Sequence, residues 1–371
     1  MSAALLVLVA RLAGCAAAPE GWTESERAVI LAMSPIPAPP ARPTNAVADD
    51  PRAAALGARL FFDTGLSRSG TVACSTCHDP ARRFTDGKRV AAALGTGTRN
   101  TPTIESAAWQ TWYFWDGRAD SAWAQATGPL THPDEHGLDA AGVRARVAEA
   151  HAEAYAAVFG PLPDDAERVL VEVGKALEAY ERTLRPPEAP LDRYVADLRA
   201  GRASAALTPA QEEGLRVFLR SGCANCHHGP WLTDHQFHNL GLPSRTTVGI
   251  DPGRARGAAL VKQDPRNCAG TWADRTPGSA DDGDPPCPEL QYLDPSFPDW
   301  PSAFKTPTLR GVGATAPYMH DGQLGSLGAV VTFYDALPGT ALVGHRETIL
   351  RPLGLGADAR ASLEAFLAGA L

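Results

Sequence analysis

Four of the seven cysteines lie in two copies of a short motif, C-x-x-C-H, at residues 74–78 and 223–227. This pattern attaches haem covalently, because its two thiols bond to the haem and the adjacent histidine becomes an axial ligand of the iron. The two copies therefore predict two covalently bound haem c groups. The expected attachment residues are Cys74, Cys77, Cys223 and Cys226, and the expected iron ligands are His78 and His227.

Pairs of C-x-x-C also occur in zinc sites, so the spacing of the two motifs matters. His227 lies about 150 residues after His78, whereas the pairs of a zinc ribbon lie roughly 15–20 residues apart. The segments before the motifs are also related, with Gly-Ala-Arg-Leu-Phe at 57–61 and Gly-Leu-Arg-Val-Phe at 214–218. We interpret them as one duplicated unit, an amphipathic helix that leads into a haem-binding loop.

Helices are the elements that must position these motifs. Capping patterns predict helices that begin after Thr23, Asp50 and Thr208, the second reaching Phe62. No convincing alternating strand pattern is present, so we expect a mainly α fold with two cytochrome c-like haem domains. The expected division is a leader at 1–20, an N-terminal haem domain at 21–200 and a C-terminal haem domain at 201–371. Further helical periodicity covers residues 143–159, 166–184, 325–337 and 358–371.

The composition excludes several classes of protein. A hydrophobic fraction of 44% with 20% charged residues is ordinary for a globular chain, which rules out a largely disordered chain and a polytopic membrane protein. The net charge of -8 argues against a nucleic-acid partner, because non-specific binders need a basic face. The 35 glycines and 32 prolines predict long irregular loops between the helices.

The first residues resemble an export signal. The apolar run at 3–10 is too short to span a bilayer, which takes about 20 residues, and is typical of a signal peptide. The following Leu-Ala-Gly-Cys sequence resembles a bacterial lipobox, which makes Cys15 a lipidation candidate. The alternative is an ordinary cleaved signal that removes Cys15. Because covalent haem is attached outside the cytoplasm, we expect a periplasmic protein, and lipidation of Cys15 would be its only contact with a membrane.

Two further cysteines, Cys268 and Cys287, lie in a stretch rich in Pro, Asp and Gly at 251–300 that has no periodic apolar pattern. In an oxidising compartment we expect them to form a disulfide. Closing this loop would stabilise the fold by about 3 kcal/mol relative to the unfolded chain. The alternative is a pair of unpaired thiols.

The second axial position of each haem decides between electron transfer and chemistry. Only Met319 is a candidate for a His/Met site, because Met1 and Met33 lie far from either motif. At least one haem must therefore use another ligand or stay open. The loop at 79–99, after the first motif, contains neither His nor Met, so we infer an open iron at the first haem.

Four further segments make a family resemblance specific. The chain resembles the bacterial di-haem cytochrome c peroxidase and MauG superfamily from about Leu56 to the C-terminus. Besides both haem motifs, the segments that carry the resemblance are Arg-Asn-Thr-Pro-Thr at 99–103, Phe-Trp-Asp-Gly-Arg at 114–118, Lys-Thr-Pro-Thr-Leu-Arg at 305–310 and Thr-Ala-Pro-Tyr-Met-His-Asp-Gly at 315–322.

The resemblance implies roles for residues around the first haem. The family's tryptophan between the two haems, which carries charge between them, corresponds to Trp115. A Gln ten residues later and a Glu twenty residues later line the family's peroxide pocket, and here they are Gln125 and Glu135. A carboxylate at that place can move a proton between the oxygens of peroxide. The resemblance also implies one calcium ion between the domains, held by Asn100, Thr315 and Pro317.

The branch of the family is indicated by the second haem. Ordinary peroxidases have a Met fourteen residues after the His of the Pro-Tyr-x-His segment, whereas MauG and its relatives have a Tyr. Counting from His320 reaches Tyr334, so this chain resembles the Tyr branch, and we expect Met319 to be a packing residue. A phenolate ligand favours oxidised iron, which predicts a lower potential than that of a His/Met site.

Three functions follow from these patterns. The leading hypothesis is an enzyme that reduces hydrogen peroxide at the first haem, with electrons from a small cytochrome c or cupredoxin relayed through the second. The second hypothesis is a MauG-like enzyme that uses the same oxidising centre on a protein substrate. The third is a di-haem electron carrier without catalysis, which a sixth protein ligand at the first iron would favour.

Overall fold

The computed structural model describes residues 21–242, 249–274 and 287–371. These residues form thirteen α-helices, five short 3-10 helices and two strands of two residues each. The mainly α fold expected from the sequence is therefore confirmed. The predicted leader at 1–20, with Cys15, lies outside the described residues. None of the helices in the described part of the chain has the length and apolar character that a membrane span requires.

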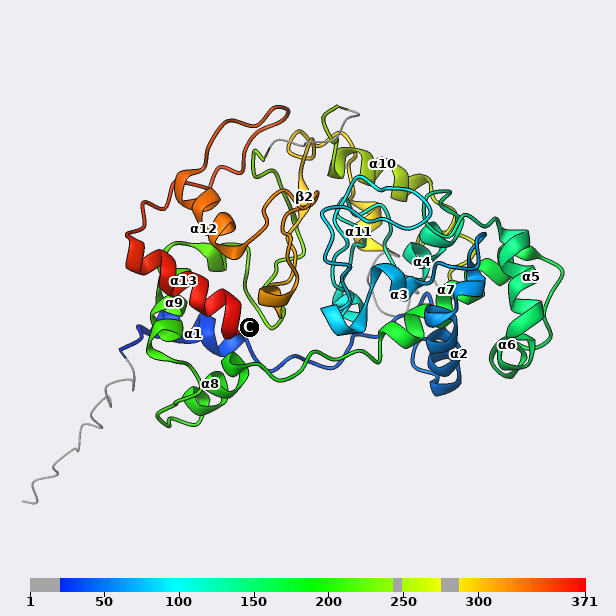
Figure 1. The fold of residues 1–371 in the computed structure, drawn as a ribbon, viewed down its shortest axis with the longest axis horizontal. Helices are drawn as coiled ribbons and strands as arrows, with labels where there is room; N and C mark the ends of the chain where they lie inside the picture. Colours follow the sequence, from blue (N-terminus) through cyan, green and yellow to red (C-terminus); the bar gives the residue numbers. More distant parts are fainter. Residues whose placement is uncertain (1–20, 243–248, 275–286) are drawn as a thin grey trace, which may run out of the picture.

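The helices gather into two halves, on the two sides of Figure 1. One half contains the first haem motif, and the other contains the second. The helices of the first half are α2 (Pro51–Phe62), α3 (Cys74–Cys77), α4 (Ala122–Thr131), α5 (Ala140–Ala150), α6 (Ala152–Phe159), α7 (Ala166–Glu181), α10 (Arg254–Gln263) and α11 (Pro288–Gln291). Those of the second half are α1 (Glu24–Ala32), α8 (Pro190–Arg199), α9 (Pro209–Arg220), α12 (Leu327–Ala336) and α13 (Ala357–Gly369).

Short elements connect these helices. The strands β1 (Phe237–His238) and β2 (Phe304–Lys305) pair antiparallel, with Phe237 opposite Lys305 and His238 opposite Phe304. The five 3-10 helices are η1 (Thr64–Leu66), η2 (Pro80–Arg82), η3 (Ala107–Trp109), η4 (Cys223–Asn225) and η5 (Val312–Ala314).

The three helix starts that the capping patterns predict are confirmed. The side chains of Thr23, Asp50 and Thr208 accept hydrogen bonds from the first backbone N–H groups of α1, α2 and α9. Each cap satisfies a donor that has no partner inside its helix. These starts could be predicted because the partners lie within three residues of each other.

Each haem motif follows a helix that packs very closely on a second helix. In the first half a Cβ at Gly57 of α2 would overlap the carbonyl oxygen of Ala176 in α7. In the second half a Cβ at Gly214 of α9 would overlap the carbonyl oxygen of Ser362 in α13. The two glycines occupy the same position in the related segments before the motifs, so the duplication includes this helix contact.

The hydrophobic cores do not divide at residue 200, where the sequence analysis places the domain boundary. α1 and α8 precede that residue, yet they pack with α9 and α13 of the second half. One apolar cluster contains Ile30 of α1, Met33 at the end of α1, Tyr194 of α8, and Leu215 and Phe218 of α9. Conversely, α10 and α11 lie after residue 250 in the sequence, yet they share an apolar cluster with Trp112 of the first half.

One local prediction needs correction, and one stretch contains helices that its sequence pattern does not indicate. The periodic segment at 143–159 forms two helices, because the chain breaks at His151, whose Nε2 lies 2.7 Å from Oδ2 of Asp63 at the end of α2. In the stretch at 251–300, where no periodicity was found, the structure contains α10. Only Ala258 and Val261 are buried apolar side chains in α10, so it lacks an amphipathic pattern.

Cys268 and Cys287 form a disulfide in the structure, which is the pairing that the sequence analysis expects. Their side chains pack beside Phe237 and Trp300 in the cluster that α10 and α11 share. The disulfide thus belongs to the apolar cluster that joins α10 and α11 to Trp112 of the first half.

Replacing Gly57 by Ala tests the contact between α2 and α7. We expect the added Cβ to overpack the contact and to lower the free energy of unfolding by about 1–3 kcal/mol. This loss outweighs the gain of about 1 kcal/mol that Ala gives over Gly in helix propensity. The measurement is the thermal midpoint of the holoprotein. Gly325→Ala is the matched control, because Gly325 is exposed and a Cβ there meets nothing within 4 Å. An equal midpoint in the Gly57→Ala variant and in this control would contradict the role of the contact.

Candidate functional site

Both haem motifs border a single cavity of about 1150 Å³. Cys77 and His78 line it from the first motif, and Cys223, Cys226 and His227 line it from the second. The volume exceeds the roughly 300–1,000 Å³ that is usual for one small-molecule pocket. Its size and mainly apolar wall fit two large planar groups of the kind that the motifs attach.

The two motif histidines are oriented by the same hydrogen bond. His78 Nδ1 lies 3.0 Å from the carbonyl oxygen of Phe84, and His227 Nδ1 lies 3.0 Å from that of Leu232. A carbonyl can only accept, so Nδ1 carries the proton in each ring and Nε2 keeps its lone pair for a metal. Burial lowers the pKa of both imidazoles, which favours this neutral form.

Glu135 and Gln125 lie on the cavity wall on the side of the first motif. Gln125 comes from α4, and Glu135 comes from the turn that follows α4. Burial raises the pKa of the Cys77 thiol to about 11, and the negative charges of Asp86 and Glu135 add to this shift, which shows that Glu135 is close to the motif. The structure thus places both residues on the wall of the cavity that the first motif borders, and their catalytic roles stay a prediction.

Glu135 is partly buried and lies near His132 and Arg118. Its side chain is 36% exposed, and its Oε1 lies 3.9 Å from Nδ1 of His132. Desolvation raises the pKa of Glu135, although the charges of His132 and Arg118 oppose this effect. A carboxyl group whose pKa moves toward neutral pH is suited to both giving and taking a proton.

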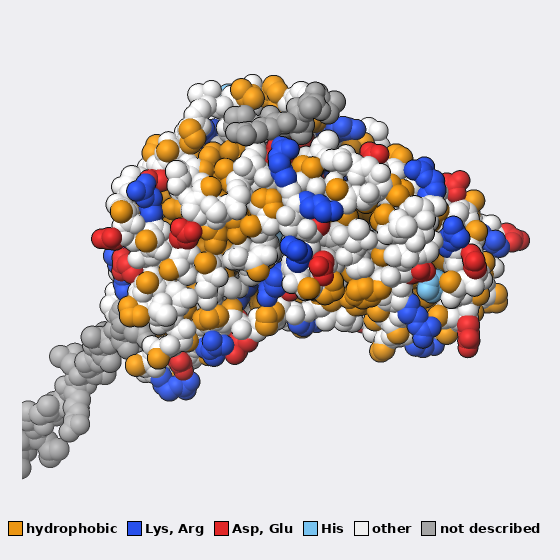
Figure 2. Space-filling view, in the orientation of Figure 1, with side chains coloured by type: hydrophobic (Ala, Val, Ile, Leu, Met, Phe, Trp, Pro, Cys, Tyr) orange, Lys and Arg blue, Asp and Glu red, His pale blue; other side chains and the backbone are white. Residues whose placement is uncertain are grey.

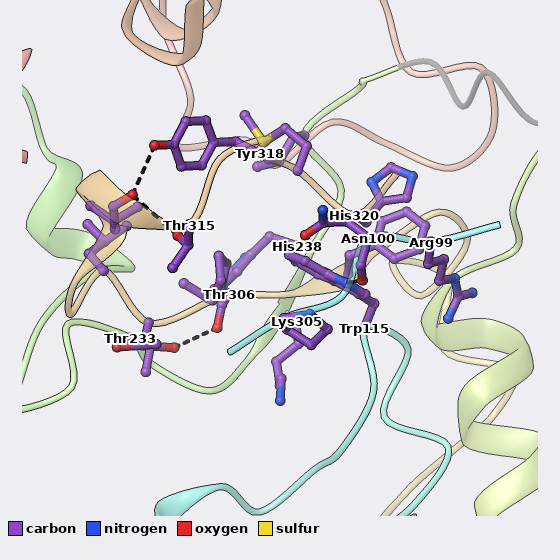
Figure 3. A pocket seen from close by; sticks show the side chains of 18 of the residues that line it. Arg99, Asn100, Trp115, Thr233, His238, Lys305, Thr306, Thr315, Tyr318 and His320 are labelled. Atoms are coloured by element: carbon purple, nitrogen blue, oxygen red, sulfur yellow. Dashed lines mark hydrogen bonds between the residues drawn. The ribbon is translucent and has the colours of Figure 1, made fainter. Parts of the chain in front are cut away.

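Trp115 is fixed by backbone contacts from both halves. Its indole Nε1 donates to the carbonyl oxygen of Asn100 at 2.8 Å, and its own carbonyl accepts from the Lys305 N–H at 2.8 Å. Ion pairs of Arg99 also stabilise this region, because its guanidinium lies 2.8 Å from a carboxylate oxygen of Asp116 and 2.8 Å from one of Asp251. Figure 3 shows Trp115 next to Lys305 and Asn100 on the cavity wall.

Two ionisable residues on the wall have no assigned role in the sequence analysis. Lys305 is enclosed beside the carbonyl oxygen of Trp112, 2.8 Å from its Nζ, and burial lowers its pKa to about 7. His320 stacks on Phe304 with ring centroids 3.7 Å apart, and burial lowers its pKa to about 4. Both belong to family segments quoted from the sequence, but nothing in a single sequence shows that His320 is buried and Lys305 half-buried.

A third polar group on the wall is His238, which lies between two carboxylates. Its Nε2 is 2.8 Å from Asp234 and its Nδ1 is 2.8 Å from Glu347. Its hydrogen bond with Asp234 leads the effects that raise its pKa to about 11, so the imidazole is a cation. The second motif thus has an ion-paired cation at the edge of its cavity.

Two residues near the second motif are candidates for its remaining axial position. Tyr334 projects from α12 and borders the cavity. Burial raises its pKa, and the charges of Cys223 and Cys226 add to the shift, so Tyr334 lies near this motif. Met319 borders the same cavity, so the choice of Tyr334 as the ligand stays a prediction.

The three residues of the predicted calcium site also lie on the cavity wall. Asn100 donates through Nδ2 to the carbonyl oxygen of Lys88 at 3.0 Å, so its side-chain oxygen is available to a cation. Thr315 and Pro317 offer backbone carbonyls from one loop, and Thr315 appears beside Tyr318 in Figure 3. Oxygen donors of this kind suit a hard cation, and calcium stays a prediction.

Glu181, at the end of α7, is a buried carboxyl group on the same wall. Burial and the charge of Glu178 raise its pKa to about 8 from an ordinary value of 4.5. The folded state therefore holds one more proton than the unfolded state between these values, so stability falls as the pH rises from about 4.5 to about 8.

Glu181→Gln tests this pH dependence. We expect the variant to have a higher thermal midpoint than the wild type at about pH 8.5 and no gain at about pH 4, below both pKa values. Midpoints of the holoproteins at the two pH values are the measurement. Glu149→Gln is the control, because the Glu149 side chain is 71% exposed. A Glu181→Gln variant that loses stability at the higher pH would show that the carboxylate is paired rather than isolated.

Comparison with known proteins places this geometry in a family. Residues 51–200 match the family model described as di-haem cytochrome c peroxidase. The methylamine utilization protein MauG of Methylorubrum extorquens is 34% identical over 337 residues, which are 90% of this chain and 80% of that protein. The cytochrome c551 peroxidase of Pseudomonas aeruginosa is 30% identical over 299 residues, which are 78% and 72% of the two chains.

Solved structures agree with the sequence relatives. The diheme peroxidase BthA from Burkholderia thailandensis superposes with a TM-score of 0.66 at 26% identity, covering 86% of this chain and 85% of its own. A MauG-like protein associated with microbial copper homeostasis has a TM-score of 0.64 at 25% identity, covering 90% and 93% of the two chains. The family implies two c-type haems, which the cavity and the paired motifs fit. This chain belongs to the di-haem cytochrome c peroxidase and MauG family and is an oxidoreductase.

Proposed function

We propose that this enzyme reduces hydrogen peroxide to water at the haem site of Cys74, Cys77 and His78. Electrons would reach that site through the haem site of Cys223, Cys226 and His227. The observation that carries the proposal is the place of Glu135 and Gln125 on the cavity wall beside the first motif. A haem iron held there would supply the redox change and the cleavage of the oxygen–oxygen bond.

The protein's own contribution at this site is proton movement and positioning. Glu135 would accept a proton from the oxygen of peroxide nearer to the first motif and return it to the departing oxygen. The side-chain amide of Gln125 can donate one hydrogen bond and accept another, which would orient peroxide next to the carboxylate. Overall, one peroxide, two electrons and two protons give two molecules of water.

Trp115 would carry charge between the two halves. Its ring lies on the cavity wall that the two motifs share, and backbone hydrogen bonds from Asn100 and Lys305 hold its position. Fixed aromatic residues need little rearrangement when they gain or lose an electron. We therefore assign the exchange of electrons between the two haem sites to Trp115.

The expected partner is a small electron donor outside the cytoplasm, a cytochrome c or a cupredoxin. Lys and Arg side chains gather along the middle of the face in Figure 2, between the two halves. Positive charge at a surface attracts an acidic partner face and increases the rate of encounter. We propose that the protein is exported to the periplasm, with lipidation of Cys15 as the form of any membrane anchor.

A second candidate function is oxidation of a protein substrate. Tyr334 favours it, because Tyr334 borders the cavity near the second motif, and a tyrosine ligand stabilises oxidised iron. One relative, MauG of Methylorubrum extorquens, is named as a methylamine utilization protein. The test is a stopped-flow record of the diferric holoprotein with one equivalent of peroxide and no donor. A rapid Soret change to a long-lived oxidised state supports this candidate. The absence of a change supports instead a peroxidase that must first be reduced, or an electron carrier.

Glu135→Gln tests the proton-transfer role. We expect the rate of reaction with peroxide to fall by about 10²–10⁴-fold, because an amide cannot shuttle the proton. Stopped-flow absorption of the holoprotein at saturating peroxide is the measurement, with haem content checked for each variant. Asp134→Asn is the matched control, since Asp134 is the adjacent carboxylate on the same wall. If the Asp134 variant loses the activity and the Glu135 variant keeps it, the proton group is Asp134.

Tyr334→Phe tests the axial ligand of the second site. Removing the phenol oxygen should change the absorption and magnetic circular dichroism bands of the second haem and leave those of the first in place. Met319→Leu provides the comparison, because Met319 borders the same cavity. A second-haem spectrum that changes only in the Met319 variant would assign the ligand to Met319.

A further inference from the structure

Two tryptophans that the proposed function does not use stack across the two halves of the molecule. Trp109 ends the 3-10 helix η3 in the first half, and Trp231 follows the second haem motif. Their ring centroids lie 4.6 Å apart with an angle of 47° between the planes. This distance is at the short end of the range for interacting aromatic pairs, so the two π-systems are in direct contact.

Trp231 is joined to the loop that orients the iron ligand of the second motif. Its ring is buried, with 4% of its surface exposed. The next residue, Leu232, supplies the carbonyl that accepts the hydrogen bond from His227 Nδ1. The carbonyl of Trp231 accepts from the hydroxyl of Thr308 at 2.6 Å, and Thr308 lines the cavity. A short path of bonds thus connects this indole to the second haem site.

Trp109 continues the path toward solvent. Its ring is half-buried, and its Nε1 donates to the carbonyl oxygen of Pro37 at 3.1 Å. The guanidinium of Arg185, an exposed residue, lies 4.9 Å from the centre of its ring. The pair therefore extends from the loop that orients the iron ligand of the second site to a cationic position at the surface.

The surroundings of both indoles favour reversible electron transfer. An indole that loses one electron becomes a strong acid, and it is recovered intact only when no base removes its proton. The N–H of Trp109 faces a neutral carbonyl, which does not take up a proton. The N–H of Trp231 has no hydrogen-bond partner among the described residues.

We propose that Trp109 and Trp231 form an electron relay between the surface and the second haem site, and that a one-electron donor reduces the enzyme at Trp109. This inference rests on the proposed peroxide reduction. In each transfer the donor loses one electron, Trp109 and Trp231 pass it on, and the second site gains it. No bond forms or breaks at either indole. Two transfers with two protons from solvent balance the reduction of one peroxide to two waters.

The first test compares three substitutions in the full-length holoprotein. Trp109→Phe and Trp231→Phe each interrupt the relay, whereas Trp300→Phe removes a half-buried indole that packs on Phe297 away from the pair. Peroxide-dependent oxidation of ferrocyanide is the measurement, because the Arg185 cation beside Trp109 attracts an anionic donor. We expect kcat to fall at least tenfold in each relay variant and to stay within twofold of wild type in the control.

The opposite results are equally informative. Turnover at the wild-type rate in Trp109→Phe, the less buried of the two positions, overturns the relay even where Trp231→Phe fails to fold. The steady-state consumption of peroxide by the wild-type protein with ferrocyanide as donor tests the proposed function separately. A protein that reacts with peroxide but ignores both substitutions retains its function and loses the relay.

A second readout follows the electron hole directly. With repeated peroxide and no donor, oxidising equivalents should leave the second site through Trp231 and accumulate as chemical oxidation of Trp109. Peptide mass spectrometry should find oxidised Trp109 in the wild type and a loss of at least fivefold in Trp231→Phe. Oxidation of Trp109 that is undiminished in this variant, or no greater than that of Trp300, contradicts the relay.

Discussion

The position of each haem motif depends on two helices that meet with no side chain between them. α2 contacts α7 at Gly57, and α9 contacts α13 at Gly214. Because the backbones are in contact, close packing leaves the end of the leading helix little freedom to move. The position of the motif that follows is therefore also fixed, and in both halves its histidine lies 3.0 Å from a backbone carbonyl oxygen. The duplication therefore includes the helix contact, the haem motif and the orientation of its histidine. It does not include α1 and α8, which pack in the second half, or α10 and α11, which pack in the first.

Around these helix pairs the protein encloses a cavity of about 1150 Å³ instead of one continuous core. The apolar residues are divided among four separate clusters, which leaves the centre to be filled by groups attached at the motifs. The polar residues on the wall are consequently poorly solvated: burial raises the pKa of Glu181 and lowers those of Lys305 and His320. Such groups cost stability, and proteins retain them mainly where a site needs charge or protons.

The sequence predicts what depends on neighbouring residues and misses what depends on distant ones. The caps of α1, α2 and α9 are local, so these helices were placed correctly at their starts. The break at His151 depends on Asp63, which is 88 residues away, and the burial of Met33 and Tyr194 in the second half depends on helices beyond residue 200. The same limit applies to the site. Glu135 and Gln125 could be named from family offsets, whereas the burial of Lys305 and Glu181 is produced by tertiary packing.

The two candidate functions differ in the source of the electrons that reach the haem sites, which is either a donor or a residue of another protein. The first haem site does not determine this source. In both proposed functions, reduction of peroxide at that site leaves the protein short of two electrons. An electron supplied by a donor makes the enzyme a peroxidase, and an electron taken from a residue of another protein makes it an oxidase of that protein. A relay whose indoles keep their protons would conduct equally well for both, because its steps are reversible. Under these proposals, the identity of the partner at the surface then decides the reaction. Relatives at 34% and 30% identity to this chain, MauG of Methylorubrum extorquens and the cytochrome c551 peroxidase of Pseudomonas aeruginosa, have names that describe different roles.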